Sequence, residues 1–96
     1  MTDRELLELA AKAIGFYRFH PARRHHSGVG WNPLADDGDA LRLAVDLWIE
    51  IRVFNGQAHA GKQNKFWCTE PVGDDPHAAT RRAIVRAAAE IGKGTT

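Results

Sequence analysis

Cysteine is almost absent from this chain: Cys68 is the only one, so no disulfide can form within a single copy. Long apolar runs are also missing, and no stretch approaches the roughly 20 residues that span a bilayer. The first residues include Asp3, Glu5 and Glu8, which is the wrong charge for a secretory signal peptide. We therefore expect a soluble, cytoplasmic protein with no contact to a membrane.

A strong net charge is likewise missing. The chain has 13 lysines and arginines against 12 aspartates and glutamates, which leaves a net charge of +1. This balance argues neither for nor against nucleic acid as a partner of the molecule as a whole, so an electrostatic partner must be recognised by a local patch. The length of 96 residues is enough for one small core. We expect residues 1–96 to form a single domain.

Motifs that carry chemistry are scarce. The five histidines and Cys68 lack the CxxC or HxxxH spacing of structural zinc sites. Gly28 to Gly30 is too short for a phosphate loop, and Ser27 is not within a GxSxG nucleophile elbow. Cys68 falls in an expected strand beside Phe66, where we expect a buried, unreactive thiol. The sequence therefore predicts no metal, no cofactor and no catalytic residue, so we expect that the protein is not an enzyme.

The carboxylate cluster DDGD at residues 36–39 is the strongest apparent exception. A calcium loop of the EF-hand type that starts at Asp37 would need an oxygen ligand at Leu41 and a glutamate at Trp48, and neither position has one. The cluster does fit the start of a helix, with Asp36 or Asp37 as the N-cap and Asp39 in the first turn. We interpret DDGD as a helix start.

Periodicity and capping residues predict the other elements. A first helix should begin with the capping box of Thr2 and Glu5 and end at Gly15. A short strand is expected near 16–19, then a basic loop at 20–28 and a returning extended segment around 29–31. The second helix follows DDGD, and the last helix begins at Asp74 or Asp75 and ends at Gly92.

Three strands should lie between the second and last helices. Residues 48–54 alternate, Asn55-Gly56 is typical of a type I′ hairpin, and residues 57–60 and 65–70 continue the meander. The predicted fold class is α+β: a small antiparallel sheet of three to five strands packed with three helices, in the order α-β-β-α-β-β-β-α. We expect the three tryptophans to lie mostly in the core, with Trp67 the one most exposed on the sheet.

Two basic patches are candidate binding surfaces. The first combines cationic side chains with the aromatic residues of segment 16–19, and the second is a stripe on the last helix. Such patches suit a phosphate-bearing partner, although a solvated surface explains them equally well. The candidate partner-binding residues are Arg18, His20, Arg23, Arg24, His25, His26, Trp67, Arg81, Arg82 and Arg86.

Two segments resemble known small proteins. WNPLADDGDALRLAV (31–45) and DDPHAATRRAIVRAAAEIGK (74–93) resemble stretches of proteins of unknown function that bacteriophages and prophages encode. The general layout is similar to the accessory proteins called the phage "ABA sandwich". The resemblance implies a phage or prophage origin and a cytoplasmic location in a bacterial host cell. It brings no catalytic residues.

The resemblance leads to a functional expectation. We expect a non-enzymatic accessory protein, monomeric or homodimeric, that binds and inhibits or sequesters a host or antiviral-defence component such as a CRISPR protein. The alternative is a nucleic-acid or nucleotide-binding module that uses the basic loop. The order of elements from Asp36 to Gly92 is similar to a double-stranded RNA-binding domain, but Asp74 and Asp75 stand where such domains place lysines. A small enzyme is the remaining alternative.

Overall fold

The computed structural model describes residues 1–18 and 31–94. Within them lie three helices and three strands, in the order α1 (Asp3–Arg18), α2 (Asp37–Leu47), β1 (Glu50–Phe54), β2 (Gln57–Lys62), β3 (Phe66–Pro71) and α3 (Pro76–Lys93). The strands form an antiparallel meander in the order β1-β2-β3. This arrangement confirms the predicted α+β class.

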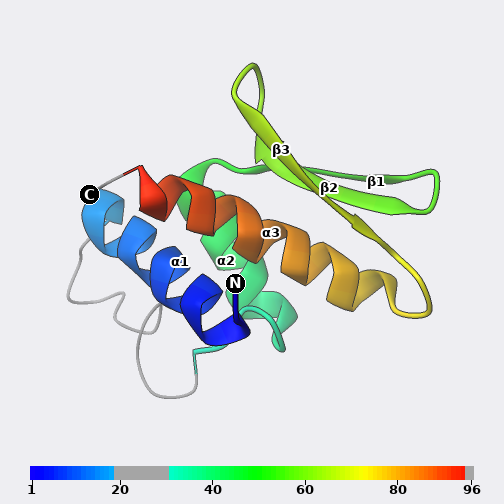
Figure 1. The fold of residues 1–96 in the computed structure, drawn as a ribbon, viewed down its shortest axis with the longest axis horizontal. Helices are drawn as coiled ribbons and strands as arrows, with labels where there is room; N and C mark the ends of the chain where they lie inside the picture. Colours follow the sequence, from blue (N-terminus) through cyan, green and yellow to red (C-terminus); the bar gives the residue numbers. More distant parts are fainter. Residues whose placement is uncertain (19–30, 95–96) are drawn as a thin grey trace.

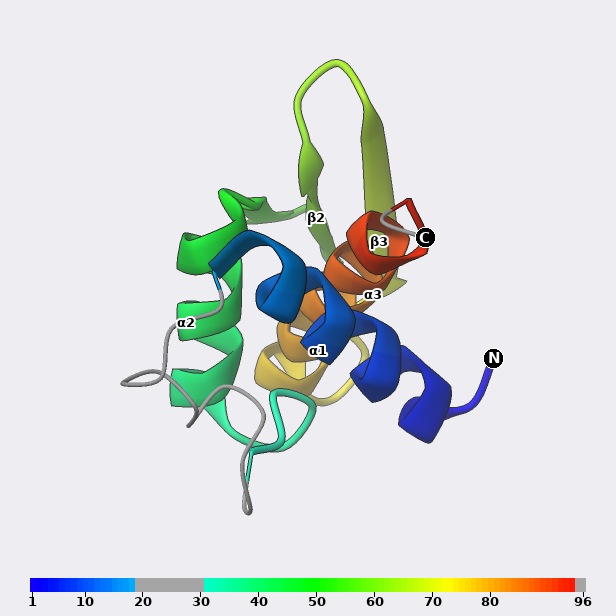
Figure 2. The ribbon, with the colours of Figure 1, turned by 90° about the vertical axis from the view of Figure 1, so that its left-hand side faces the viewer.

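The central element is α3, which lies between the sheet and α1 (Figures 1 and 2). Helix α2 runs beside α1 and α3 and leads directly into β1 (Figure 1). The inward side of α3 is rich in alanine, and Ala83, Ala87 and Ala88 are completely buried. These small side chains let α1 and the sheet approach α3 closely from its two sides. The core is therefore shared by all three helices and one face of the sheet.

Local sequence signals set most helix boundaries. The capping box is present: the Thr2 amide donates to Glu5 Oε1 at 2.8 Å, and the Glu5 amide donates to Thr2 Oγ1 at 3.1 Å. The hydrogen bond from the Thr2 amide lowers the pKa of the Glu5 carboxyl. Asp75 caps α3 by accepting from the Ala78 amide at 3.0 Å, and Pro76 occupies the first turn. These parts of the prediction are confirmed.

Two boundaries differ from the prediction. The chain from residue 16 to Arg18 continues α1 rather than forming a strand, and Gly15 lies within the helix. The β propensity of aromatic residues is weak against an established helix that packs on a neighbour. Helix α3 also passes through Gly92, which is buried against the backbone of Leu9 in α1. Gly92 is thus a contact residue and not the predicted stop.

The region between α1 and α2 is described only in part. The expected basic loop at 20–28 lies outside the described residues, as do residues 29 and 30 of the expected extended segment. Trp31 is described, lies in no strand and packs against the core.

The hairpin between β1 and β2 has the predicted turn. Asn55 and Gly56 have φ of 52° and 72°, which is the pair of positive values that a type I′ turn requires. The turn sets the register, in which Phe54 pairs with Gln57 and Arg52 pairs with His59. As a result one face of the sheet packs on α3 and the other face points away from the helices (Figure 1).

Candidate interaction surface

The outward side of the sheet forms what we call the open face. The register brings eight side chains from all three strands onto it: Glu50, Arg52, Phe54, Gln57, His59, Trp67, Thr69 and Pro71. No helix in the described part of the chain covers this face (Figure 1). It is therefore a broad, mixed surface that solvent or a partner can reach.

The centre of the open face is a contact between Arg52 and Trp67. The Arg52 guanidinium carbon lies 5.0 Å from the Trp67 ring centroid, within the range of a cation–π interaction. The contact spans β2, where Gly61 stands beside Trp67 and has no side chain to intervene. Glu50 also pairs with the guanidinium, with Oε2 2.8 Å from Arg52 Nη2. Trp67 is 38% exposed, so its ring remains available to a partner.

A second group on the open face surrounds His59. The Nδ1 atom of His59 is 2.9 Å from Thr69 Oγ1, and the imidazole centroid is 5.1 Å from that of Phe54. His59 Nε2 is buried and has no hydrogen-bond partner among the described residues. Aromatic rings and fixed polar atoms together resemble the centre of a protein interface more than an ordinary solvated sheet.

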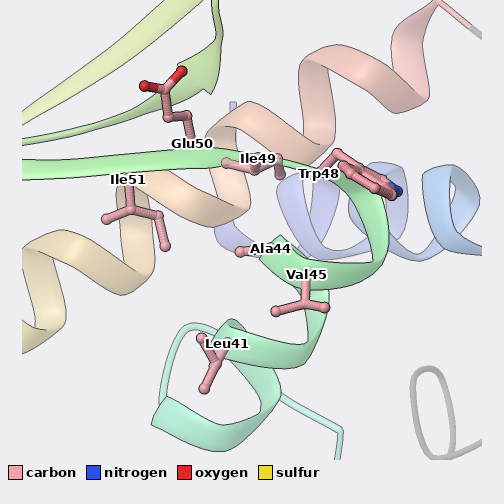
Figure 3. A pocket seen from close by; sticks show the side chains of 7 residues that line it. All are labelled: Leu41, Ala44, Val45, Trp48, Ile49, Glu50 and Ile51. Carbon is pink, nitrogen blue, oxygen red and sulfur yellow. The ribbon is translucent and has the colours of Figure 1, made fainter.

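A second apolar surface lies on α2 beside β1. Leu41, Val45 and Trp48 follow at helical spacing and line a hollow of about 470 Å³ together with Ile51 (Figure 3). Their exposed fractions are 58%, 64% and 80% respectively. The expectation that Trp48 lies in the core is therefore wrong. Trp48 ends α2 in the left-handed conformation, with φ 59° and ψ 43°, which places its side chain outside the helix bundle.

The sequence could have indicated this second surface but did not. The helical spacing of Leu41, Ala44, Val45 and Leu47 predicts a single apolar face on this helix. The structure divides them into two stripes: Ala44 and Leu47 are buried, whereas Leu41 and Val45 are exposed. The sequence signal that indicates such a surface is a helix with apolar residues on more than one side, because only one side can face the core.

The predicted basic stripe on α3 is tied into the fold. Arg81 donates to Asp37 Oδ1 at 2.6 Å and to the Leu34 carbonyl at 2.8 Å. Arg82 donates to Asp3 Oδ1 at 2.9 Å. These bonds join α3 to α1 and to the start of α2, so these two positive charges are compensated where they lie.

The third arginine of the stripe joins α3 to the sheet. Arg86 donates to Glu70 Oε2 at 2.5 Å and to the Thr69 carbonyl at 3.1 Å. Of the other candidate residues, Trp67 lies on the open face. The side chain of Arg18 and the residues His20, Arg23, Arg24, His25 and His26 lie outside the described part of the chain.

The DDGD cluster is a helix start, as predicted. Asp36 Oδ2 accepts from the Asp39 amide at 2.8 Å, which is the N-cap bond of α2. Asp39 is buried, accepts from the Asn32 amide at 2.9 Å and pairs with Arg42 Nη2 at 2.7 Å. Asp37 pairs with Arg81. Asp36 and Asp39 thus share Arg42, whereas Asp37 points to Arg81, and the three carboxylates do not converge on one site.

Groups suited to catalysis do not cluster in the described residues. No three histidine, cysteine or acidic side chains there are close enough to bind a metal ion together. Cys68 lies on the inner face of β3 with 7% of its surface exposed, as predicted, and burial raises the pKa of its thiol. The raised pKa makes the reactive thiolate scarce near neutral pH.

Comparison of the chain with known protein families, curated proteins and solved structures gives no match. In the described ranges, none of the helices combines the length and the apolar character needed to cross a membrane.

Proposed function

We propose that this protein is a non-enzymatic binding module that captures another protein on the open face of its sheet. The Arg52–Trp67 contact carries the proposal: a cation and a large aromatic ring are fixed together on a surface that no described helix covers. Tryptophan and arginine are the residue types that most often dominate binding energy at protein interfaces. Because the two side chains are already in contact, little conformational entropy is lost when a partner binds them.

The charge of the open face favours a protein over a nucleic acid. Glu50 and Arg52 form an ion pair, which leaves the face near neutral when His59 is uncharged. A phosphate backbone needs several uncompensated cations, and its binding is driven by their counterion release. The arginines of α3 are paired with carboxylates as well. The open face therefore offers stacking groups without the positive field that nucleic acid requires.

The resemblance to phage accessory proteins suggests the biological partner. We propose that it is a host or antiviral-defence protein, and that the module inhibits or sequesters it by covering a surface that it needs. This mechanism requires no catalysis. It requires a rigid face, which the packing of the sheet on α3 supplies.

Affinity capture from bacterial cells, with and without nuclease, tests the proposal. Three forms of the full chain serve as bait: the unaltered protein, Trp67→Ala and the control Lys12→Ala. Lys12 is exposed on α1, on the other side of α3 from the sheet (Figure 1). Circular dichroism establishes that each variant folds.

The proposal requires a protein that is enriched on the unaltered bait and on Lys12→Ala, is lost on Trp67→Ala, and resists nuclease. Loss of all captured material after nuclease treatment would instead support the nucleic-acid alternative. Equal enrichment on all three baits would place the binding surface elsewhere.

A further inference from the structure

We propose that two copies of this chain associate through β1, which pairs antiparallel with β1 of the second copy about a two-fold axis at Ile51. The two meanders then form one continuous six-stranded sheet. This inference concerns the free edge of β1 and does not depend on the proposed function of the open face.

The free edge of β1 has unpaired backbone groups. The two-residue turn makes Phe54–Gln57 a hydrogen-bonded pair, so hydrogen-bonded pairs alternate along the hairpin at Arg52 and Glu50. The amides and carbonyls of Ile51 and Val53 therefore point away from β2. The register of β1 is continuous, and the strand contains neither a proline nor a lysine, the usual devices that protect an edge.

The opposite edge of the sheet is protected in part. The same alternation makes Trp67, Thr69 and Pro71 the residues of β3 whose backbone points outward. Pro71 has no amide hydrogen to donate, and the Thr69 carbonyl already accepts from Arg86 at 3.1 Å. The β1 edge, which has neither a proline nor a carbonyl that is already bonded, is thus the less protected of the two.

Apolar side chains gather around the β1 edge. Seven large apolar residues of the described chain are exposed, and five of them flank this edge: Leu41, Val45, Trp48, Val53 and Phe54. The hollow between α2 and β1 lies directly beneath it (Figure 3). A strand added there would extend the apolar inner face over the exposed stripe of α2. An exposed apolar patch of this kind marks an association surface.

The sequence of β1 is complementary to itself in one register. Backbone alternation allows two-fold pairing centred on Ile51, on Arg52 or on Val53. Centring on Arg52 places two arginines opposite each other, and centring on Val53 places Arg52 opposite Phe54. Centring on Ile51 places Glu50 of each copy opposite Arg52 of the other, and Ile51 opposite Ile51. Charge complementarity therefore selects a second copy of this chain and the Ile51 register.

The two-fold axis has a structural consequence. It runs perpendicular to the sheet, so the open faces of both copies point to the same side. The dimer would present two Trp67 side chains on one surface.

Sedimentation equilibrium of the purified full chain, with no partner present, tests the association at about 100 μM, where a specific interface should be populated. We expect twice the 10.6 kDa mass of one chain. In the Ile51 register, Glu50→Arg places two arginines opposite each other at both symmetric positions, and Arg52→Glu does the same with two glutamates. Each substitution should raise the dissociation constant of the dimer about tenfold. The double variant restores both pairs and should recover the dimer. Lys65→Glu, in the turn after β2, is the matched control and should have no effect.

Cysteine cross-linking identifies the register. In a Cys68→Ala background, Ile51→Cys should form a disulfide between copies, because paired Cα atoms about 5.5 Å apart are within disulfide range. Arg52→Cys and Val53→Cys should cross-link poorly, since they mark the other two registers. The proposal is overturned if the unaltered chain sediments as a monomer. It is also overturned if the double charge variant fails to recover the dimer, or if either of the other cysteines cross-links in preference to Ile51→Cys.

Discussion

Arg52 lies over the indole ring of Trp67, although the two residues come from strands at opposite edges of the sheet. They meet because Gly61, on the strand between them, has no side chain. A Cβ atom at Gly61 would also lie 2.1 Å from the carbonyl oxygen of Phe66, so only glycine fits. The absence of a side chain at Gly61 therefore allows Arg52 and Trp67 to contact each other on the open face.

The Arg52–Trp67 contact should be measurable as a coupling energy. We expect a double-mutant cycle of Arg52→Ala and Trp67→Ala, measured by urea unfolding, to give a coupling of about 0.5–1 kcal/mol. A cycle of Arg42→Ala with Trp67→Ala is the control. Arg42 lies on α2, so the effects of these two substitutions on the free energy of unfolding should be additive. A coupling of zero for the first pair would show that the contact does not persist in solution.

Two glycines should respond in opposite directions to the same substitution. Gly92→Ala places a Cβ 2.1 Å from the Leu9 carbonyl oxygen, so we expect a loss of about 1–3 kcal/mol in the free energy of unfolding. Gly15→Ala meets no atom within 4 Å inside α1 and should gain about 0.5–1 kcal/mol. Urea denaturation measures both. A harmless Gly92→Ala would mean that α1 and α3 are not in close contact.

The DDGD cluster should stabilise the fold and should not bind metal ions. Asp39→Ala removes the buried acceptor of the Asn32 amide and the partner of Arg42, and should cost about 1–3 kcal/mol. The exposed Asp74→Ala should change stability by less than about 0.5 kcal/mol. Calcium at about 10 mM should leave the Tm unchanged, because only a ligand that binds the folded state raises it. A rise in Tm of the unaltered chain with calcium would contradict the helix-start interpretation.

Cys68 should make stability fall at alkaline pH. Burial raises the pKa of the thiol in the folded chain, so the unfolded chain loses its proton first as the pH rises. Above about pH 8.5 the folded chain still binds a proton that the unfolded chain has released. The free energy of unfolding therefore decreases as the pH rises further. Compared with the unaltered protein, Cys68→Ala should lose less stability between neutral and alkaline pH. The thiol should also react more slowly with a disulfide reagent in the folded chain than in urea, and equal rates would contradict its burial.

The features that the sequence predicted correctly depend on neighbouring residues. The capping box of Thr2 and Glu5, the N-cap at Asp36 and the Asn55-Gly56 turn each need only a few adjacent positions. Strand alternation likewise placed Trp67 on the exposed side of β3. These signals fixed the class of the fold from Asp36 onward.

The features that the sequence did not predict depend on contacts across the fold. The sequence around Gly92 predicts a helix stop, since nothing local shows that Leu9 lies against this glycine. The segment from residue 16 to Arg18 was assigned to a strand by propensity alone. The Arg52–Trp67 contact needed the strand register, and the exposure of Trp48 needed its left-handed backbone. Each of these follows from tertiary geometry that periodicity does not encode.

The most direct test of the open face is an equilibrium binding titration with the purified protein that the capture experiment identifies. We expect Trp67→Ala to raise the Kd at least about tenfold, as truncation of a central aromatic residue does, while Lys12→Ala leaves it unchanged. We also expect the Kd to change little with salt, because the face is near neutral. An unchanged Kd for a folded Trp67→Ala would contradict the account.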